Sequence, residues 1–176
     1  MDRKADRKTE RNKCELCGGI MVTRKATSDQ PYRYEMSGLD NVLLIGIEVR
    51  ECSKCHARVP VIPKIAALHK AIAEDLLLKK ELLSGKEIRF LRKNAGVAAK
   101  EFAALISVDP SHLSRVENGK IENLSPGIDK LARAVAAVAS DGGNLRKVVL
   151  ALAAERLNPQ LSLFSLKKDH WEKLAA

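Results

Sequence analysis

The stretch "AKEFAALISVDPSHLSRVENGK", residues 99–120, predicts two short helices joined by a tight turn. Apolar residues recur at helical spacing on both sides of the turn. Asp109 and Pro110 are residue types favoured at the N-cap and at the first position of a helix, so they predict where the second helix begins. Gly119 is suited to end it, because glycine readily adopts the left-handed conformation that follows many helices.

The apolar pattern is typical of a helix-turn-helix, a motif in which two helices cross at a steep angle around a short turn. The crossing leaves room for only a small side chain, which Ala103 provides. The residues predicted to be buried are Phe102, Ala103, Ile106, Val108, Leu113 and Val116. The residues predicted to lie on or near the exposed face of the second helix are Ser111, His112, Ser114 and Arg115.

The candidate DNA-binding residues differ in what they could contact. The second helix of such a motif lies in the major groove with its N-terminal residues over the base edges. In this set Arg115 alone can hold a guanine through two hydrogen bonds, so we expect it to read one base position. A plainer interpretation makes Arg115 a phosphate contact or the partner of a nearby acid. Lys100 and Lys120 are expected nearer the phosphates. The full candidate set is Lys100, Ser111, His112, Ser114, Arg115 and Lys120.

Helix signals flank the motif on both sides. Ser84 and Glu87 form a capping-box pattern ahead of a helix that would end at Gly96. Ser125 and Pro126 mark the start of another helix. The predicted buried stripe of that helix is Ile128, Leu131, Val135 and Val138. Upstream, apolar residues at helical spacing within residues 63–83 predict a helical linker.

The last predicted helix spans residues 144–157 and ends before Pro159. One side of it is apolar and suits pairing with a second copy of the chain, although it could instead pack within its own domain. A two-fold homodimer would read a palindromic operator with half-sites about one DNA turn, ~34 Å, apart. The residues of that side are Leu145, Val148, Val149 and Leu152.

All four cysteines occur in two C-x-x-C pairs, Cys14 with Cys17 and Cys52 with Cys55. Two such pairs can complete a tetrahedron of thiolates around Zn²⁺, and a closed four-ligand site is typical of a structural metal. Redox chemistry of the cysteines is the alternative. The order C-x-x-C-H at residues 52–56 also matches covalent haem attachment, but that interpretation leaves the first pair unexplained.

The chain around the cysteines is predicted to form a small β-sheet. Residues 31–36 and 43–52 alternate apolar and polar side chains, with turn residues between them. Gly18 and Gly19 suit a sharp turn beneath the sulfurs. Such a domain has little core, so bound zinc would supply folding energy. His56 is expected to face solvent, because four thiolates already close the site.

Two families resemble parts of this chain. The segment "LSRVENGK", residues 113–120, and its flanking pattern resemble the Xre, or lambda-repressor-like, DNA-binding domain over residues 84–157. The segments "CELCGG", "SGLDNV" and "CSKC" resemble the YgiT-type zinc finger. This order of domains is similar to that of MqsA-like antitoxins. Ala99 stands where the Xre family usually has a glutamine that contacts the DNA backbone, and Ser107 stands where the turn usually has glycine.

The composition narrows the class of protein. The formal net charge of +9 favours a polyanionic partner, although many basic proteins have none. The first residues are charged throughout, and no run of about 18 apolar residues occurs. We therefore expect a cytoplasmic protein that does not enter a membrane. The sequence contains no catalytic dyad or phosphate-binding loop, so we expect no enzymatic activity.

The predicted fold has two domains: a small zinc-bound β-rich N-terminal domain joined by a helix to an all-α, lambda-repressor-like helix-turn-helix domain. The predicted function is that of a dimeric, sequence-specific transcriptional repressor. The resemblance implies an antitoxin that binds its toxin through the zinc domain and represses its own operon. The alternatives are a toxin-binding protein with residual DNA binding and a stand-alone zinc-containing regulator. The expected segments are a basic arm (1–12), the zinc domain (13–62), the helical linker (63–83), the helix-turn-helix domain (84–157) and a tail (158–176).

Overall fold

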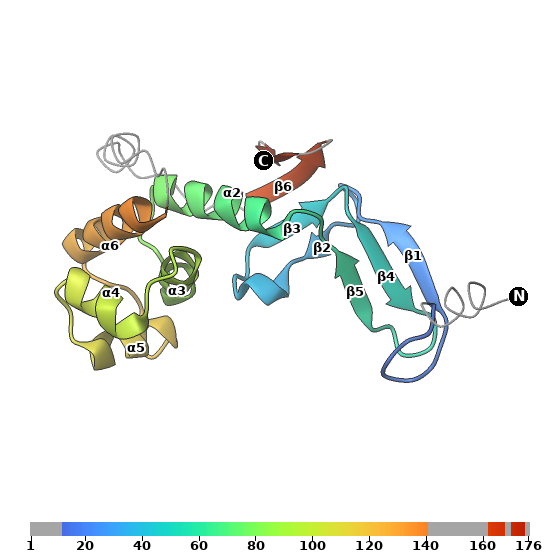
Figure 1. The fold of residues 1–176 in the computed structure, drawn as a ribbon, viewed down its shortest axis with the longest axis horizontal. Coiled ribbons are helices and arrows are strands. Elements are labelled where there is room, and N and C mark those ends of the chain that lie inside the picture. The colour runs from blue at the N-terminus through green and yellow to red at the C-terminus, as the bar shows by residue number, and fades with distance from the viewer. Residues whose placement is uncertain (1–11, 141–161, 168–169, 175–176) are drawn as a thin grey trace, which may run out of the picture.

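A computed structural model describes residues 12–140, 162–167 and 170–174. The helices α3, α4, α5 and α6 gather at one end of the molecule, and the strands β1, β4 and β5 lie at the other, with α2 between them (Figure 1). The elements are β1 (Met21–Lys25), β2 (Tyr32–Arg33), the 3-10 helix η1 (Glu35–Ser37), β3 (Val42–Ile45), β4 (Glu48–Cys52), β5 (Arg58–Val61), α2 (Ile65–Leu78), α3 (Gly85–Asn94), α4 (Ala99–Leu105), α5 (Pro110–Glu117), α6 (Pro126–Ala139), β6 (Ser162–Lys167) and β7 (His170–Leu174).

The cysteines belong to a three-stranded antiparallel sheet with the order β1-β4-β5. Met21 of β1 pairs with Cys52 of β4, so the second cysteine pair follows directly from the end of the central strand. Val22, Val59 and Val61 are between 46% and 57% exposed on this sheet. The sheet therefore has little apolar core of its own. A β-rich N-terminal region that carries the four cysteines is confirmed.

A second sheet, with the order β2-β3-β6-β7, joins two parts of the chain that are far apart in the sequence. β6 pairs with β3 in parallel, from Val42 opposite Ser162 to Ile45 opposite Ser165. Phe164 of β6 is 1% exposed and belongs to the main core. The segment expected to be a tail thus supplies two strands, and α3 to α6 lie in the chain between strands of one sheet.

The predicted strand over residues 31–36 is only partly correct. β2 covers Tyr32–Arg33, and the chain then turns into η1. The reason is that Tyr34 is drawn into the core, where it is 2% exposed and its hydroxyl bonds with Nε2 of His69 on α2 at 2.8 Å. His69 in turn meets the ring of Phe90 on α3 edge-on. These three side chains connect the β-region, α2 and the helical end.

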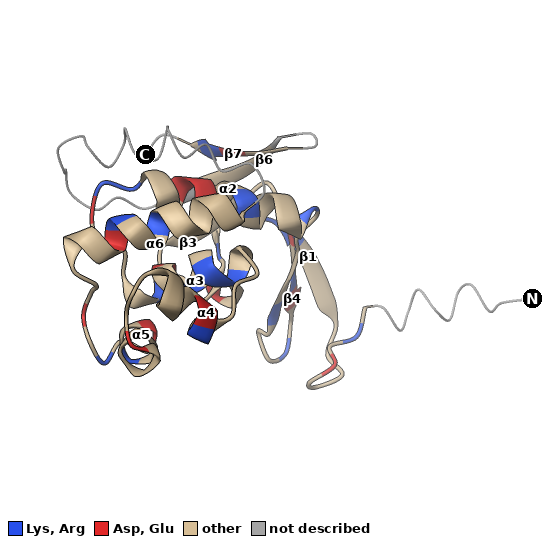
Figure 2. Cartoon of the chain, turned by 60° about the vertical axis from the view of Figure 1, so that its left-hand side comes forward, with Lys and Arg blue, Asp and Glu red and all other residues tan. Residues whose placement is uncertain are grey.

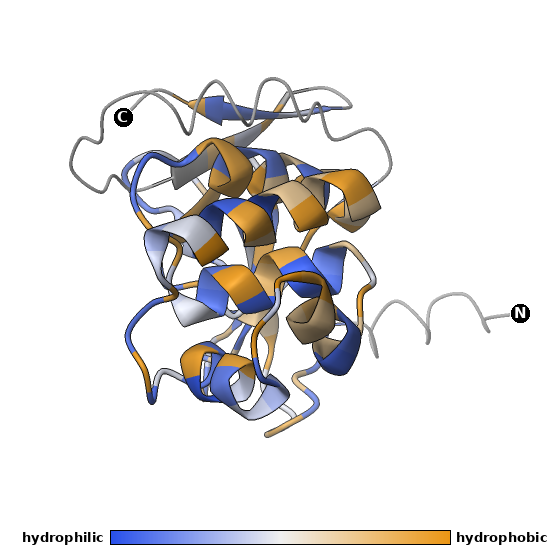
Figure 3. Ribbon diagram, turned by 90° about the vertical axis from the view of Figure 1, so that its left-hand side faces the viewer, coloured by the Kyte–Doolittle hydropathy of each residue, from blue (hydrophilic) through white to orange (hydrophobic). Residues whose placement is uncertain are grey.

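Local signals at the helix ends behave as expected. Both hydrogen bonds of the predicted capping box between Ser84 and Glu87 are formed at the start of α3. The carboxylate of Asp109 accepts hydrogen bonds from the backbone N–H groups of Ser111 and His112 at the start of α5. Polar and apolar residues alternate along the helices of this end (Figure 3). The predicted starts of α3 and α5 are therefore confirmed.

The predicted buried stripe of α6 is only partly correct. Ile128 and Val135 are half-buried and pack against the main core. Leu131 and Val138 are 38% and 68% exposed, and the buried apolar residues of this helix are alanines. The helix is rotated because Asp129 and Arg133 form an ion pair that is buried with the alanines. Small side chains on that face allow close packing, which a stripe of larger residues would prevent. The buried alanines are Ala132, Ala136 and Ala137.

The expected dimer helix at residues 144–157 lies outside the described residues. Within the part of the chain that the structure describes, no helix combines the length and the apolar character needed to cross a membrane.

Candidate nucleic-acid interface and metal centre

α4 and α5 form the two helices of the predicted helix-turn-helix. The core between these two helices is closed to solvent, because five of the six residues predicted to be buried have no exposed surface. Val108, in the turn, is half-buried. The residues with no exposed surface are Phe102, Ala103, Ile106, Leu113 and Val116. Ala103 is fully buried, as predicted for the small residue between the two helices.

The turn between α4 and α5 requires a left-handed residue, and that residue is Ser107. Its φ is 56°, in a region where non-glycine residues are uncommon. The turn is closed by backbone hydrogen bonds from Ser107 N–H to the Ala104 carbonyl and from Val108 N–H to the Ala103 carbonyl. The chain therefore keeps the geometry that glycine usually provides, at a cost in backbone strain of roughly 1–2 kcal/mol.

α5 is held against α3 by a close backbone contact at Gly85. A Cβ atom at this position would lie 1.8 Å from the carbonyl oxygen of Val116, far inside any permitted contact. Glycine therefore permits the N-terminus of α3 to touch the backbone of α5. Sequence reasoning did not single out Gly85. The residues around Gly85 carry no signal of its contact with Val116, which lies far away in the sequence.

A buried ion pair provides the second link between these helices. The guanidinium group of Arg92 on α3 donates to both carboxylate oxygens of Glu117 on α5, at 2.7 and 2.9 Å. A third hydrogen bond reaches the carbonyl oxygen of Val97, ahead of α4, at 3.0 Å. The hydrogen bond with Glu117 raises the pKa of Arg92. One side chain thus connects α3, α5 and the segment that leads into α4, and sequence reasoning also missed this link.

The exposed side of α5 carries the predicted DNA-binding side chains. Ser111, Ser114 and Arg115 are exposed, and His112 is half-buried. The Ser111 hydroxyl donates to Asp109 at 2.5 Å, and this bond, with the backbone N–H groups of Ser111 and His112 and the charge of Arg115, lowers the pKa of Asp109. Among the described residues, Arg115 makes no side-chain hydrogen bond or ion pair.

The two predicted phosphate contacts lie outside α5. Lys100 is exposed in the first turn of α4, and Lys120 is exposed directly after Gly119, which has a φ of 70°. The Asn118 side chain that precedes it donates to the Ser114 backbone carbonyl at 2.7 Å. α5 therefore offers Ser111 and Arg115 toward a ligand, with one lysine on a neighbouring helix and one on the following loop.

The four cysteine sulfurs converge at one end of the three-stranded sheet. All four lie within 4.8 Å of one another. Two contacts join the pairs, from Cys14 to Cys55 at 3.6 Å and from Cys17 to Cys52 at 3.5 Å. Tetrahedral zinc with bonds of about 2.3 Å would hold its sulfurs roughly 3.8 Å apart, whereas a disulfide needs about 2.0 Å. The cluster therefore has the spacing of a metal site.

The chain turns beneath the sulfurs as the two glycines predicted. Gly18 has a φ of 69°. A Cβ atom at Gly19 would lie 2.9 Å from the Cys52 sulfur and 3.3 Å from the Cys17 sulfur. Glycine at the first position thus permits the turn, and glycine at the second leaves space for the sulfurs.

The protein environment already favours a thiolate at Cys52. Backbone N–H groups of Cys55 and Lys54 point at its sulfur and lower its pKa to about 6. At Cys17 the Gly19 amide also favours the thiolate, but hydrogen bonds with Cys55 and Cys52 raise its pKa to about 12. Without a cation, the Cys17 and Cys52 thiols therefore do not ionise together. A divalent ion would offset their mutual repulsion, and binding it would release protons.

His56 is not directed at the cluster. It is exposed with a φ of 57°, and its Nδ1 atom lies 3.6 Å from a carboxylate oxygen of Glu51. Its backbone N–H donates to the Cys52 carbonyl at 3.0 Å, so it helps to shape the turn. The donor set available to a metal is thus four sulfurs.

Comparison with protein families supports the motif at the helical end. Residues 88–134 match the HTH_3 family model, described as Helix-turn-helix, so this chain contains a helix-turn-helix domain that begins in α3 and ends in α6. Such a domain suggests a DNA-binding regulator, of a family that is typically not enzymatic. Neither the curated proteins nor the solved structures with which the chain was compared gave a match.

Proposed function

We propose that this protein is a sequence-specific DNA-binding transcriptional repressor whose recognition element is α5. The observation that carries the proposal is the exposed face of α5, which presents Ser111 in its first turn and Arg115 in its last turn above the buried helix-turn-helix core. The contacts at Gly85 and Glu117 support it, because a reading helix must be held rigidly by its scaffold. The formal net charge of +9 favours a duplex partner.

We further propose that the four cysteines hold Zn²⁺ as a structural ion. The sulfur spacing and the amide groups directed at Cys52 support this. A cytoplasmic location follows from the same chemistry, since reduced thiols and a DNA partner both belong to that compartment. As in structural zinc sites generally, the metal would stabilise the sheet and take no part in a reaction.

The toxin–antitoxin role is the finer part of the proposal and rests on the resemblance to MqsA-like antitoxins. In it, the zinc region binds a toxin while α5 represses the operon of the pair. The competing function is a stand-alone zinc-containing regulator. Co-purification of the chain with the product of an adjacent gene supports the first. An adjacent gene whose product neither binds this chain nor harms the cell supports the second.

Selection of binding sites from a random duplex library tests DNA recognition. We expect enrichment of a palindrome with half-sites about one turn, ~34 Å, apart, as a two-fold homodimer requires. Light scattering with and without the selected duplex would measure the homodimer directly. A library that shows no enriched sequence after repeated rounds would overturn sequence-specific recognition, and a non-palindromic site bound by a monomer would overturn the dimer alone.

A further inference from the structure

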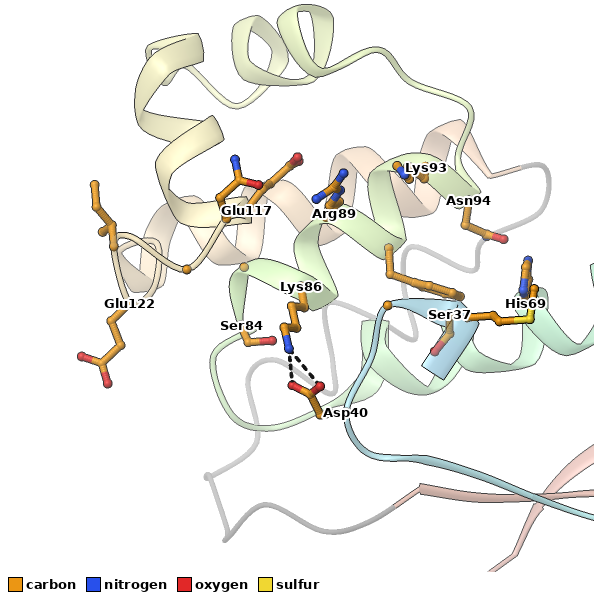
Figure 4. Close-up of a pocket in the computed structure, with 17 residues that line it drawn as sticks. Ser37, Asp40, His69, Ser84, Lys86, Arg89, Lys93, Asn94, Glu117 and Glu122 are labelled. Atoms are coloured by element: carbon orange, nitrogen blue, oxygen red, sulfur yellow. Dashed lines mark hydrogen bonds and ion pairs between the residues drawn. The ribbon is translucent and has the colours of Figure 1, made fainter. Parts of the chain in front are cut away.

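A groove separates the helical end from the loop around η1. It has a volume of about 880 Å³ and is lined by α3, by the loop that follows α5 and by the segment around η1 (Figure 4). Lys86, Arg89 and Lys93 stand in a row along the side of α3 that faces it (Figure 4). Their spacing places them on one face of the helix over roughly 10 Å.

Pairing leaves two of these cations available. Lys86 bonds with the carboxylate of Asp40 at 2.6 and 2.9 Å across the groove. Arg89 and Lys93 are exposed, and within the described ranges neither has a hydrogen-bond or ion-pair partner for its side chain. Figure 2 shows basic residues along α3.

The acids of the groove do not cancel this charge. Glu117 is buried, and its carboxylate is already held by Arg92. Asp40 is held by Lys86. Glu122, on the loop that follows α5, is the one further acid among the lining residues. Arg89 and Lys93 on α3 are thus available to bind a ligand in the groove.

The row is fixed in position relative to the recognition helix. The N-terminus of α3 touches the Val116 carbonyl through Gly85, and its C-terminal half is joined to α5 through Arg92 and Glu117. Asn118 and Gly119 line the groove and directly precede Lys120, one of the predicted phosphate contacts. The groove therefore reaches the residues on both sides of Lys120.

We propose that Arg89 and Lys93 bind the sugar-phosphate backbone of the duplex whose bases are read by α5. This inference rests on the proposed DNA-binding function and extends it to a helix outside the helix-turn-helix pair. DNA is the favoured ligand because its backbone offers one charge per 3.4 Å of each strand, so Arg89 and Lys93, about 6 Å apart along the helix, can meet separate phosphates. Such contacts would add affinity and position without sequence preference.

The salt dependence of DNA binding tests this inference. The probe is a fluorescently labelled, random-sequence duplex, titrated with the full chain at several salt concentrations. The double variant Arg89→Gln/Lys93→Gln should lower the slope of log K against log salt by roughly 2, because each lost phosphate contact removes about 0.9. The matched control is Lys25→Gln/Lys70→Gln, which removes the same charge from exposed positions on β1 and α2 and should keep the wild-type slope.

A second variant should act in the opposite direction. Asp40→Asn removes an acid from the groove and frees Lys86, so the slope should become steeper by roughly 1. A double variant that keeps the wild-type slope overturns the inference, whatever the result with Asp40→Asn. A wild-type chain that binds no duplex overturns the proposed function itself, so the two failures are distinguishable. Unchanged thermal unfolding of the double variant would show that its fold is intact.

Discussion

The guanidinium group of Arg133 on α6 donates a hydrogen bond of 3.1 Å to the backbone carbonyl of Leu76, in the last turn of α2. Arg133 has no exposed surface, and it also donates to the carbonyls of Lys79 and Glu81, which follow that helix. One arginine of the helical end therefore donates to carbonyl groups in the last turn of α2 and in the segment that follows it, where the Lys79 N–H is a second donor to the Leu76 carbonyl. α2 is anchored to the helix-turn-helix domain by this contact.

Replacement of Arg133 should destabilise the protein strongly. Arg133→Met leaves the buried carboxylate of Asp129 without its cation and removes the donors to the end of α2, so we expect a loss of about 3–5 kcal/mol in the free energy of unfolding. Lys130→Met is the matched control, because Lys130 is an exposed cation of the same helix, and it should change stability by less than about 0.5 kcal/mol. Urea unfolding measures both. Equal stability of the two variants would contradict the anchoring role.

The contact at Gly85 leads to a prediction about two glycines. Gly85→Ala places a Cβ atom against the Val116 carbonyl and should destabilise the helix-turn-helix domain by about 1–3 kcal/mol or more, since the backbone of α5 must shift. Gly127→Ala has no atom within 4 Å of the new Cβ and lies in the first turn of α6. It should be neutral or stabilising by up to about 1 kcal/mol. Thermal unfolding of the two variants would check the contrast, which vanishes if α3 does not touch α5.

The left-handed turn residue can be tested by restoring glycine. Ser107→Gly should relieve roughly 1–2 kcal/mol of strain. Glycine loses about 0.5–1 kcal/mol more backbone entropy on folding. The net expectation is a stabilisation between about 0 and 1.5 kcal/mol. Ser107→Ala keeps the Cβ atom and should leave stability close to wild type. Chemical denaturation decides between them, and a destabilised glycine variant would refute the strain at this turn.

The zinc content of variants distinguishes the cysteines, which we propose as metal ligands, from the neighbouring His56, which we expect not to bind the metal. Cys52→Ser should abolish stoichiometric zinc and unfold the sheet of β1, β4 and β5, because structural zinc supplies on the order of 10 kcal/mol and this sheet has little core. α3 to α6 should remain folded. His56→Ala should retain both the metal and the sheet, since His56 is exposed and directed at Glu51. Elemental analysis with circular dichroism measures both properties. Full zinc binding by Cys52→Ser would exclude a four-cysteine site.

The roles of Arg115 and Lys100 should differ in kind. Arg115→Ala should cost about 1–3 kcal/mol of binding and relax the preference at one base position. Lys100→Ala should weaken binding to all sequences and lower the salt slope by roughly 1. Repeating the binding-site selection with each variant distinguishes them. If both variants lose affinity uniformly and keep the wild-type base preference, Arg115 is a phosphate contact.

Much of the helix-turn-helix could be predicted from the sequence because its signals are local. A capping box joins Ser84 to a residue three positions away, and Asp109 bonds with the two N–H groups that follow Pro110. The buried residues of α4 and α5 follow the helical period over one short stretch. The two cysteine pairs were also informative, since their spacing restricts what the sulfurs can do.

Other features depend on partners that the sequence pattern does not specify. The buried face of α6 was predicted only in part, because the orientation of the helix is set by the pairing of Asp129 with Arg133 and by carbonyl groups at the end of α2. The helical pattern of apolar residues predicts the buried face only if charged residues stay exposed. A charged pair can nevertheless be buried when its hydrogen bonds are satisfied. The alanines of α6 gave no signal strong enough to outweigh Leu131 and Val138.

The sequence alone determined the presence of the helix-turn-helix, the starts of its helices and the four sulfurs available to a metal. Each of these features depends on residue types at short spacings along the chain. Only the tertiary structure decided that β6 pairs with β3, that Gly85 touches Val116 and that Arg89 and Lys93 line a groove beside α5. These relationships join residues distant in the chain. They depend on how whole elements pack, and local propensity carries no information about that choice.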